Sequence, residues 1–130
     1  MNETMTDSNF LLDTCVWIGY FSGDTPSSKE IIESSNNTLF TSVLSIYEFI
    51  KKMKDKKIPK IIIDNMIDII EESSVTLCVD GLVSKKAATN CIKFDLHAMD
   101  GLIYSTAEKK NIILITTDKH FSKTPKTIII

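Results

Sequence analysis

Apolar residues follow two patterns along the chain, short continuous runs and longer stretches that repeat every three or four positions. Short runs are typical of strands buried on both faces, and the longer repeats are typical of helices that bury one side. The runs predict strands at residues 10–13, 39–41, 75–79, 112–116 and 127–130. The repeats predict helices at residues 15–21, 27–34, 43–57, 59–73, 82–94 and 98–110.

Residues that prefer helix ends support these boundaries. Ser42 is expected to cap the helix over residues 43–57, and Ser27 or Ser28 the short helix before it. Pro59 suits the first turn of the next helix, and Asn111 suits the end of the last one. Because strands and helices alternate, we expect an α/β fold in which helices cover both faces of a parallel sheet. We expect one domain over residues 1–130, since no linker is visible.

Composition and charge narrow the possible functions. The chain has 130 residues, of which 43% are hydrophobic and 25% charged, as in an ordinary globular domain. Its net charge of −2 excludes a globally basic nucleic-acid binder but leaves room for a local basic surface. All 15 cations are Lys, so this chain cannot supply an Arg finger. The four Gly residues form neither common phosphate-loop pattern.

The cysteine residues and the hydropathy of the chain indicate in which cellular compartment the protein is expected. The three Cys residues form no C-x-x-C pair, which is typical of a reduced protein. The first nine residues are polar and acidic, unlike a signal peptide. No apolar run approaches the roughly 20 residues that span a bilayer. We therefore expect a cytoplasmic protein that does not associate with membranes.

Acidic residues stand at the ends of several predicted elements. Asp13 ends the first predicted strand and Asp118 follows the fourth, although each is explained more simply as a cap or turn residue. Asp100 lies in the first turn of its helix beside apolar positions, where a carboxylate needs a partner or benefits from the helix dipole. Glu48 is the only charge in an apolar helical stretch, where pairing with Lys52 is the simpler role.

The expected topology gives these four acids a shared location. In parallel sheets, functional groups gather beyond the carboxyl ends of the strands. Carboxylates that cluster there must take up protons or hold a cation at neutral pH. Mg²⁺ and Mn²⁺ prefer oxygen ligands, and such ions activate water and stabilise both oxygens of a phosphoryl displacement. Hydrolysis of phosphodiester bonds is therefore the leading hypothesis.

Lys residues near the acids offer contacts for a phosphate backbone. Lys51 and Lys52 begin a run of six Lys over residues 51–60, and Lys119 directly follows Asp118. Attraction of RNA is one role for these cations. A solvated helix end is the alternative for the run.

Aromatic and imidazole side chains also lie near the acids in the sequence. The aromatic rings can stack on single-stranded bases, and the imidazoles can move protons or bind a metal. Packing or a surface position is the simpler role for each of them. These residues are Trp17, Tyr20, Tyr47, Tyr104, His97 and His120.

Four segments carry the acids in order: FLLDT at residues 10–14, SVLSIYEF at 42–49, MDGLIYSTA at 99–107 and LITTDKHF at 114–121. Together they resemble the successive motifs of PIN-domain ribonucleases, particularly the VapC-like toxins. The resemblance covers about residues 9–122 and implies a PIN-like three-layer α/β/α sandwich with a roughly five-stranded parallel sheet. It also implies an endoribonuclease that depends on Mg²⁺ or Mn²⁺.

The resemblance implies roles for individual residues and partners. The catalytic and metal-binding positions of the family fall on Asp13, Glu48, Asp100 and Asp118, with Thr14 and Thr116 in support. The implied partners are an RNA substrate, a second copy of the chain and, for a toxin, a cognate antitoxin. Two positions depart from the family pattern: Cys15 stands where many relatives have Asn or another polar residue, and His120 where an acid often precedes the Phe.

Two other functions remain open at this point. A constitutive RNA-processing nuclease of the PIN type would use the same residues. A non-catalytic or regulatory α/β module, such as a phosphoacceptor receiver, would use Asp80, which follows the third predicted strand. Such a receiver usually has a second acid after the first strand, where this chain has Thr14.

Overall fold

Strands and helices alternate through residues 8–130, which the computed structural model describes; most of the polar N-terminal segment falls outside them. The strands are β1 (Ser8–Leu12), β2 (Asn37–Ser42), β3 (Val75–Leu77), β4 (Ile113–Thr116) and β5 (Thr127–Ile129). The helices are α1 (Thr14–Ser22), α2 (Pro26–Glu33), α3 (Val43–Asp55), α4 (Lys60–Ser73), α5 (Gly81–Phe94) and α6 (Ala98–Lys110). A short 3₁₀ helix, η2 (Lys119–Phe121), lies between β4 and β5.

The five strands form one parallel sheet in the order β3-β2-β1-β4-β5, which confirms the expected sheet. The central strand β1 pairs with β2 on one side and β4 on the other, so that Phe10 lies opposite both Leu39 and Ile113. The direction of strand order reverses between β1 and β4. Their carboxyl ends lie side by side there, and the residues that follow them meet at the same edge.

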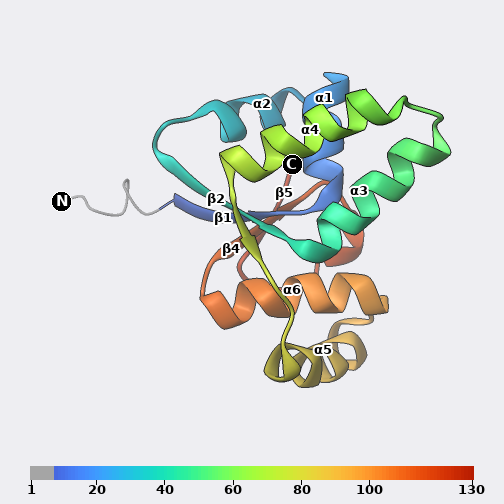
Figure 1. Ribbon diagram of the computed structural model, residues 1–130. Helices are drawn as coiled ribbons and strands as arrows, with labels where there is room; N and C mark the ends of the chain where they lie inside the picture. Colours follow the sequence, from blue (N-terminus) through green and yellow to red (C-terminus); the bar gives the residue numbers. More distant parts are fainter. Residues whose placement is uncertain (1–7) are drawn as a thin grey trace.

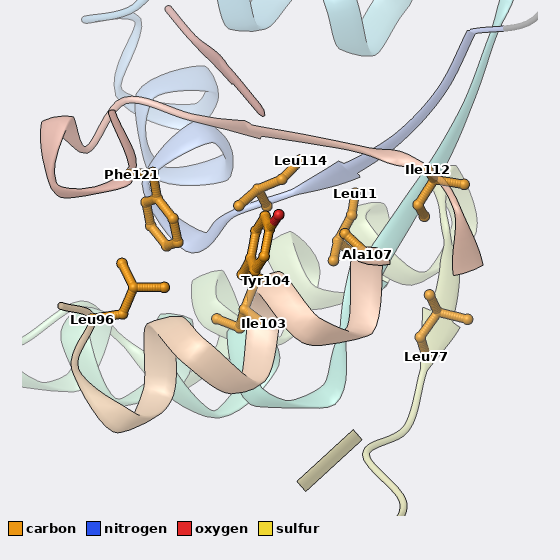
Figure 2. Packing of buried hydrophobic residues seen from close by; sticks show 9 residues of the cluster. All are labelled: Leu11, Leu77, Leu96, Ile103, Tyr104, Ala107, Ile112, Leu114 and Phe121. Atoms are coloured by element: carbon orange, nitrogen blue, oxygen red, sulfur yellow. The ribbon is translucent and has the colours of Figure 1, made fainter. Parts of the chain in front are cut away.

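Helices cover both faces of the sheet, with α1, α2, α3 and α4 on one side and α5 and α6 on the other (Figure 1). Successive residues of a strand point to opposite faces, so each central strand contributes to two buried clusters. Leu11 and Leu114 pack against α6 in one cluster (Figure 2), and Leu12 and Ile115 pack against α1 and α3 in the other. This arrangement explains the continuous apolar runs and confirms the three-layer sandwich. Within residues 8–130, no helix has the length and hydropathy needed to cross a bilayer.

Helix boundaries differ from the sequence prediction at α2. Thr25, in extended conformation, is the N-cap, and Pro26 occupies the first helical turn. The prediction that Ser27 or Ser28 caps this helix is wrong, because the fixed φ of Pro26 starts the helix earlier. Ser42 does cap α3 as predicted, since its hydroxyl accepts a hydrogen bond from the Leu44 N–H at 3.1 Å.

The two helices on the second face are packed unusually closely. Gly101 of α6 faces Cys91 of α5, and a Cβ added at Gly101 would lie 2.1 Å from the Cys91 Sγ. Beside this contact, the buried Asn90 side chain donates hydrogen bonds to Ser105 Oγ at 2.9 Å and Glu108 Oε1 at 3.0 Å. Because Asp100 precedes Gly101, this contact also fixes the part of α6 that carries the acid.

Replacement of Gly101 by Ala should lower the free energy of unfolding by about 1–3 kcal/mol, the usual cost of overpacking. Gly81→Ala is the matched control, because a Cβ at Gly81 would meet nothing within 4 Å. Urea denaturation of both variants measures the difference. Equal stabilities for the two variants would contradict the proposed tight contact between α5 and α6.

Candidate functional site

The Asp13 carboxylate is held at the junction of β1 and α1. It caps α1, since Oδ1 accepts a hydrogen bond from the Thr14 N–H at 2.8 Å, and Oδ2 accepts one from the Thr116 hydroxyl at 2.8 Å. The residue is only 6% exposed. Burial raises the pKa of Asp13 above its usual range, although the hydrogen bonds from Thr116 and Thr14 oppose this rise. The site therefore contains a buried carboxylate whose charge is incompletely compensated.

Thr116, at the end of β4, connects two of the predicted acids. Its hydroxyl donates to Asp13 and accepts a hydrogen bond from the Asp118 N–H at 3.0 Å. The side chain is completely buried. The supporting position expected for Thr116 therefore has a physical basis in this structure, because one hydroxyl positions Asp13 and the loop that carries Asp118.

Cys15 also links the ends of β1 and β4. Its Sγ lies 3.6 Å from Asp13 Oδ2 and 3.4 Å from Thr116 Oγ1, and it accepts a hydrogen bond from the Thr117 N–H at 3.3 Å. Burial, followed by the charge of Asp13, raises the pKa of the Cys15 thiol. In the sequence, Cys15 stood out only as a departure from the family pattern. Its position two residues after Asp13, in the first turn of α1, was the available signal for this role.

Glu48, in α3, is held by α1. The Thr14 hydroxyl donates a hydrogen bond of 2.6 Å to Glu48 Oε1. In the described part of the chain Glu48 forms no ion pair with Lys52, so the simpler role considered for it is wrong. Thr14 thus connects Asp13, whose carboxylate its N–H contacts, with Glu48.

Asp118 lies just beyond β4 and caps η2. Its Oδ1 accepts a hydrogen bond from the His120 N–H at 2.9 Å and lies 2.8 Å from His120 Nδ1. The His120 ring meets the ring of His97, the N-cap residue of α6, edge to face at 6.1 Å between centroids. Two imidazoles that are far apart in the sequence therefore stand together beside Asp118.

The pKa of Asp100, in the first turn of α6, is affected by the charges of the other three acids. The pKa of Asp100 is raised to about 6, first by burial and then by the charges of Asp13, Asp118 and Glu48, in that order. The His97 side chain acts in the opposite direction. Carboxylates from the β1–α1 junction, α3, α6 and the loop after β4 therefore interact at the carboxyl edge of the sheet, as the sequence predicted.

The chemistry of these side chains fits a hard divalent cation. Within residues 8–130, no three His, Cys, Asp or Glu side chains are gathered closely enough to hold a metal ion as they stand. The acids nevertheless repel one another across a common space, and their donors are carboxylate and hydroxyl oxygens. Mg²⁺ and Mn²⁺ prefer such ligands and retain several waters, so a few carboxylates suffice to bind them.

The three Lys residues predicted to bind RNA lie near the acids, whereas the candidate phosphoacceptor Asp80 has contacts of its own elsewhere. Lys51 and Lys52 are exposed on α3, where they line a cavity together with Glu48, and Lys119 is exposed in η2. Asp80, the candidate phosphoacceptor, caps α5 through the Val83 N–H and pairs with Lys109.

Comparison with known proteins identifies the family. The sequence profile of the PIN domain matches residues 10–127. The chain belongs to the PIN domain family. A search of curated protein sequences gives no match.

Solved structures share this PIN fold at low sequence identity. VapBC2 from Rickettsia felis, bound to a DNA fragment from its promoter, gives a TM-score of 0.77 at 18% identity, covering 94% of this chain and 97% of the other. A toxin-antitoxin complex from Klebsiella pneumoniae gives 0.76 at 18% identity, covering 91% and 94%. VapC20 from Mycobacterium tuberculosis, described as a sarcin-ricin loop cleaving toxin, gives 0.72 at 15% identity, covering 90% and 95%.

The raised pKa of Asp100 predicts how the metal-free PIN domain responds to pH. The folded state binds this proton more tightly than the unfolded chain, so the contribution of Asp100 to stability is complete below about pH 4 and is lost as pH rises through about 6. Asp100→Asn removes this loss. At pH 7 in EDTA, its free energy of unfolding should exceed that of wild type by about 1 kcal/mol, a value discounted because solvent screens a half-buried carboxylate.

Urea denaturation in EDTA across this pH range tests the prediction. Asp68→Asn, at an exposed position of α4, is the matched control and should keep the wild-type dependence. The same pH dependence in wild type and Asp100→Asn would show that Asp100 does not cause it.

Proposed function

We propose that this PIN domain is a divalent-metal-dependent endoribonuclease that hydrolyses RNA phosphodiester bonds and acts in the cytoplasm as the toxin of a toxin-antitoxin pair. The observation that carries the proposal is the cluster of four acids. Thr14 links Asp13 to Glu48, and Thr116 links Asp13 to the loop of Asp118. The charges of these three acids also act on Asp100. Family membership and the fold likeness to VapC20, described as a cleaving toxin, support it. The proposal treats residues 1–130 as one nuclease domain.

The proposed site would hold Mg²⁺ or Mn²⁺ through Asp13, Asp100 and Asp118, with Glu48 acting through water or orienting the nucleophile. When bound, the ion would supply an activated water and stabilise charge on the phosphoryl oxygens. The protein keeps the ligands in place through hydroxyl groups, since Thr116 fixes Asp13 and Thr14 fixes Glu48. Both contacts are made before any substrate arrives, which lowers the cost of ordering the site.

Substrate contacts in this proposal come from Lys51, Lys52 and Lys119, which are exposed beside the acids. Lys ammonium groups bind phosphates as point charges and do not form the two parallel hydrogen bonds that Arg makes. These contacts would therefore attract the RNA backbone and contribute little to the choice of sequence.

The proposed partners are a cognate antitoxin and a second copy of the chain. The antitoxin is supported by the Klebsiella pneumoniae and Rickettsia felis structures, which are described as a toxin-antitoxin complex and as VapBC2. Large apolar side chains exposed on α4 and α5 support association with other chains. These residues include Ile61, Ile62, Ile69, Leu82 and Ile92.

Cleavage of labelled single-stranded RNA tests the chemistry. Wild type should cleave with Mg²⁺ or Mn²⁺ and lose activity in EDTA, and Asp13→Asn should reduce kcat/KM by more than about 10²-fold, because it removes a ligand charge. Asn is also a good N-cap, so this variant should keep α1 intact. Asp68→Asn, with its exposed side chain, should remain fully active. Unchanged cleavage both in EDTA and by Asp13→Asn would overturn the metal mechanism.

Growth of a bacterial host distinguishes a toxin from a constitutive RNA-processing enzyme. Induced expression of wild type should arrest growth, and Asp13→Asn at the same protein level should not, because arrest depends on cleavage. Co-expression of an antitoxin encoded next to the gene should restore growth by blocking the site. Harmless expression of an active nuclease would favour the constitutive enzyme.

A further inference from the structure

A cavity of about 340 Å³ lies on the α3 side of the site and is lined by Glu48, one of the four acids. Most of its wall comes from α3, where residues four positions apart lie on one face of the helix. Met99, at the start of α6, supplies the rest. The lining residues are Tyr47, Glu48, Lys51, Lys52, Asp55 and Met99.

Tyr47 is an accessible aromatic ring in this wall. Its exposure is 56%, whereas Trp17 and Tyr104 are 1% and 4% exposed. The buried rings also have hydrogen-bond partners within the fold, because Trp17 Nε1 donates to Thr41 Oγ1 and the Tyr104 hydroxyl donates to the Pro125 carbonyl. Of the aromatic residues that the sequence placed near the acids, Tyr47 is thus available to a ligand, and Trp17 and Tyr104 serve the core.

The cavity is continuous with the proposed catalytic site through two residues. Glu48 lines it and is also one of the four acids, and Met99 directly precedes Asp100. Glu48 also accepts a hydrogen bond from Thr14, whose N–H contacts Asp13. A nucleotide whose phosphate lies at these acids can therefore place a neighbouring base toward the cavity. The volume is at the lower end of the range for small-molecule pockets, which suits one nucleotide.

Charge determines which part of a nucleotide fits inside. The wall carries the carboxylates of Glu48 and Asp55 and the two Lys ammonium groups, so its formal charges cancel and a neutral polar base can lie against it. Met99 offers an apolar, adaptable surface, and Tyr47 offers a ring face. The exposed Lys51 and Lys52 are then left to bind the phosphates that flank the base.

We propose that this cavity is a nucleotide subsite in which Tyr47 stacks on one base of single-stranded RNA next to the cleaved phosphate. The inference rests on the proposed ribonuclease function and adds a residue that contacts a base of the substrate. Bases of a duplex are stacked on one another and present no free face, so the subsite selects unpaired RNA. Stacking tolerates any base, and this subsite would thus favour single strands without a strong sequence preference.

The test compares Tyr47→Leu with Tyr47→Phe. Fluorescence anisotropy with a labelled 12-nucleotide single-stranded RNA in EDTA gives Kd, and cleavage of the same RNA in Mg²⁺ gives KM. Tyr47→Leu should raise both by about tenfold, as expected for loss of one stacked base, and Tyr47→Phe should stay within about twofold of wild type because it retains the ring. Val75→Ala, on the edge strand β3 and 50% exposed, is the control for loss of an exposed apolar side chain.

The outcomes separate this inference from the proposed function. Normal binding and cleavage of single-stranded RNA by Tyr47→Leu would overturn the subsite and leave the ribonuclease standing. A loss in Tyr47→Phe as large as that in Tyr47→Leu would assign the effect to the hydroxyl and also overturn stacking. Failure of wild type to cleave any RNA would overturn the proposed function and this inference with it. Tyr47 is exposed, so unchanged thermal unfolding of the variants checks that the fold is kept.

Discussion

The hydrogen bond between Thr116 and Asp13 joins the two strands at which the strand order reverses, and the site depends on it. A buried carboxylate loses much of its hydration, and hydrogen bonds to its charged form recover only part of that loss. Asp13 shows the balance directly, because its pKa remains above the usual range despite the contacts from Thr116 and Thr14. The remaining unfavourable energy is of the kind that a bound cation would remove.

The scaffold around this junction is rigid for simple reasons. Leu11, Leu12, Leu114 and Ile115 alternate between two buried clusters, so β1 and β4 cannot slip by one residue without turning apolar side chains toward the wrong layer. On the second face, the contact of Gly101 with Cys91 fixes α6 next to α5. The acids are therefore attached to elements that have little freedom to move apart in response to their mutual repulsion.

Sequence patterns predicted the sheet and the meeting of the four acids, because both follow from topology. Because β1 and β4 are parallel neighbours, the residues that follow them, Asp13 and Asp118, come together. Details that depend on side-chain geometry were not predictable. Spacing alone made Lys52 a reasonable partner for Glu48, but the fold provides Thr14 from another helix. The same limit applies to Cys15, whose contacts with Thr116 and Thr117 cross the sheet, and to Tyr47, whose exposure depends on how α3 and α6 pack.

Asp13 has two tasks, since the carboxylate that belongs to the site also caps α1. This double role restricts how the sequence can change over evolutionary time. Most replacements would remove the charge and the helix cap together, and selection against unfolding would eliminate them even where catalysis was no longer needed. Asn is different, because it caps a helix about as well as Asp. A lineage that abandoned the chemistry and kept the scaffold for binding would therefore be expected to carry Asn at this position.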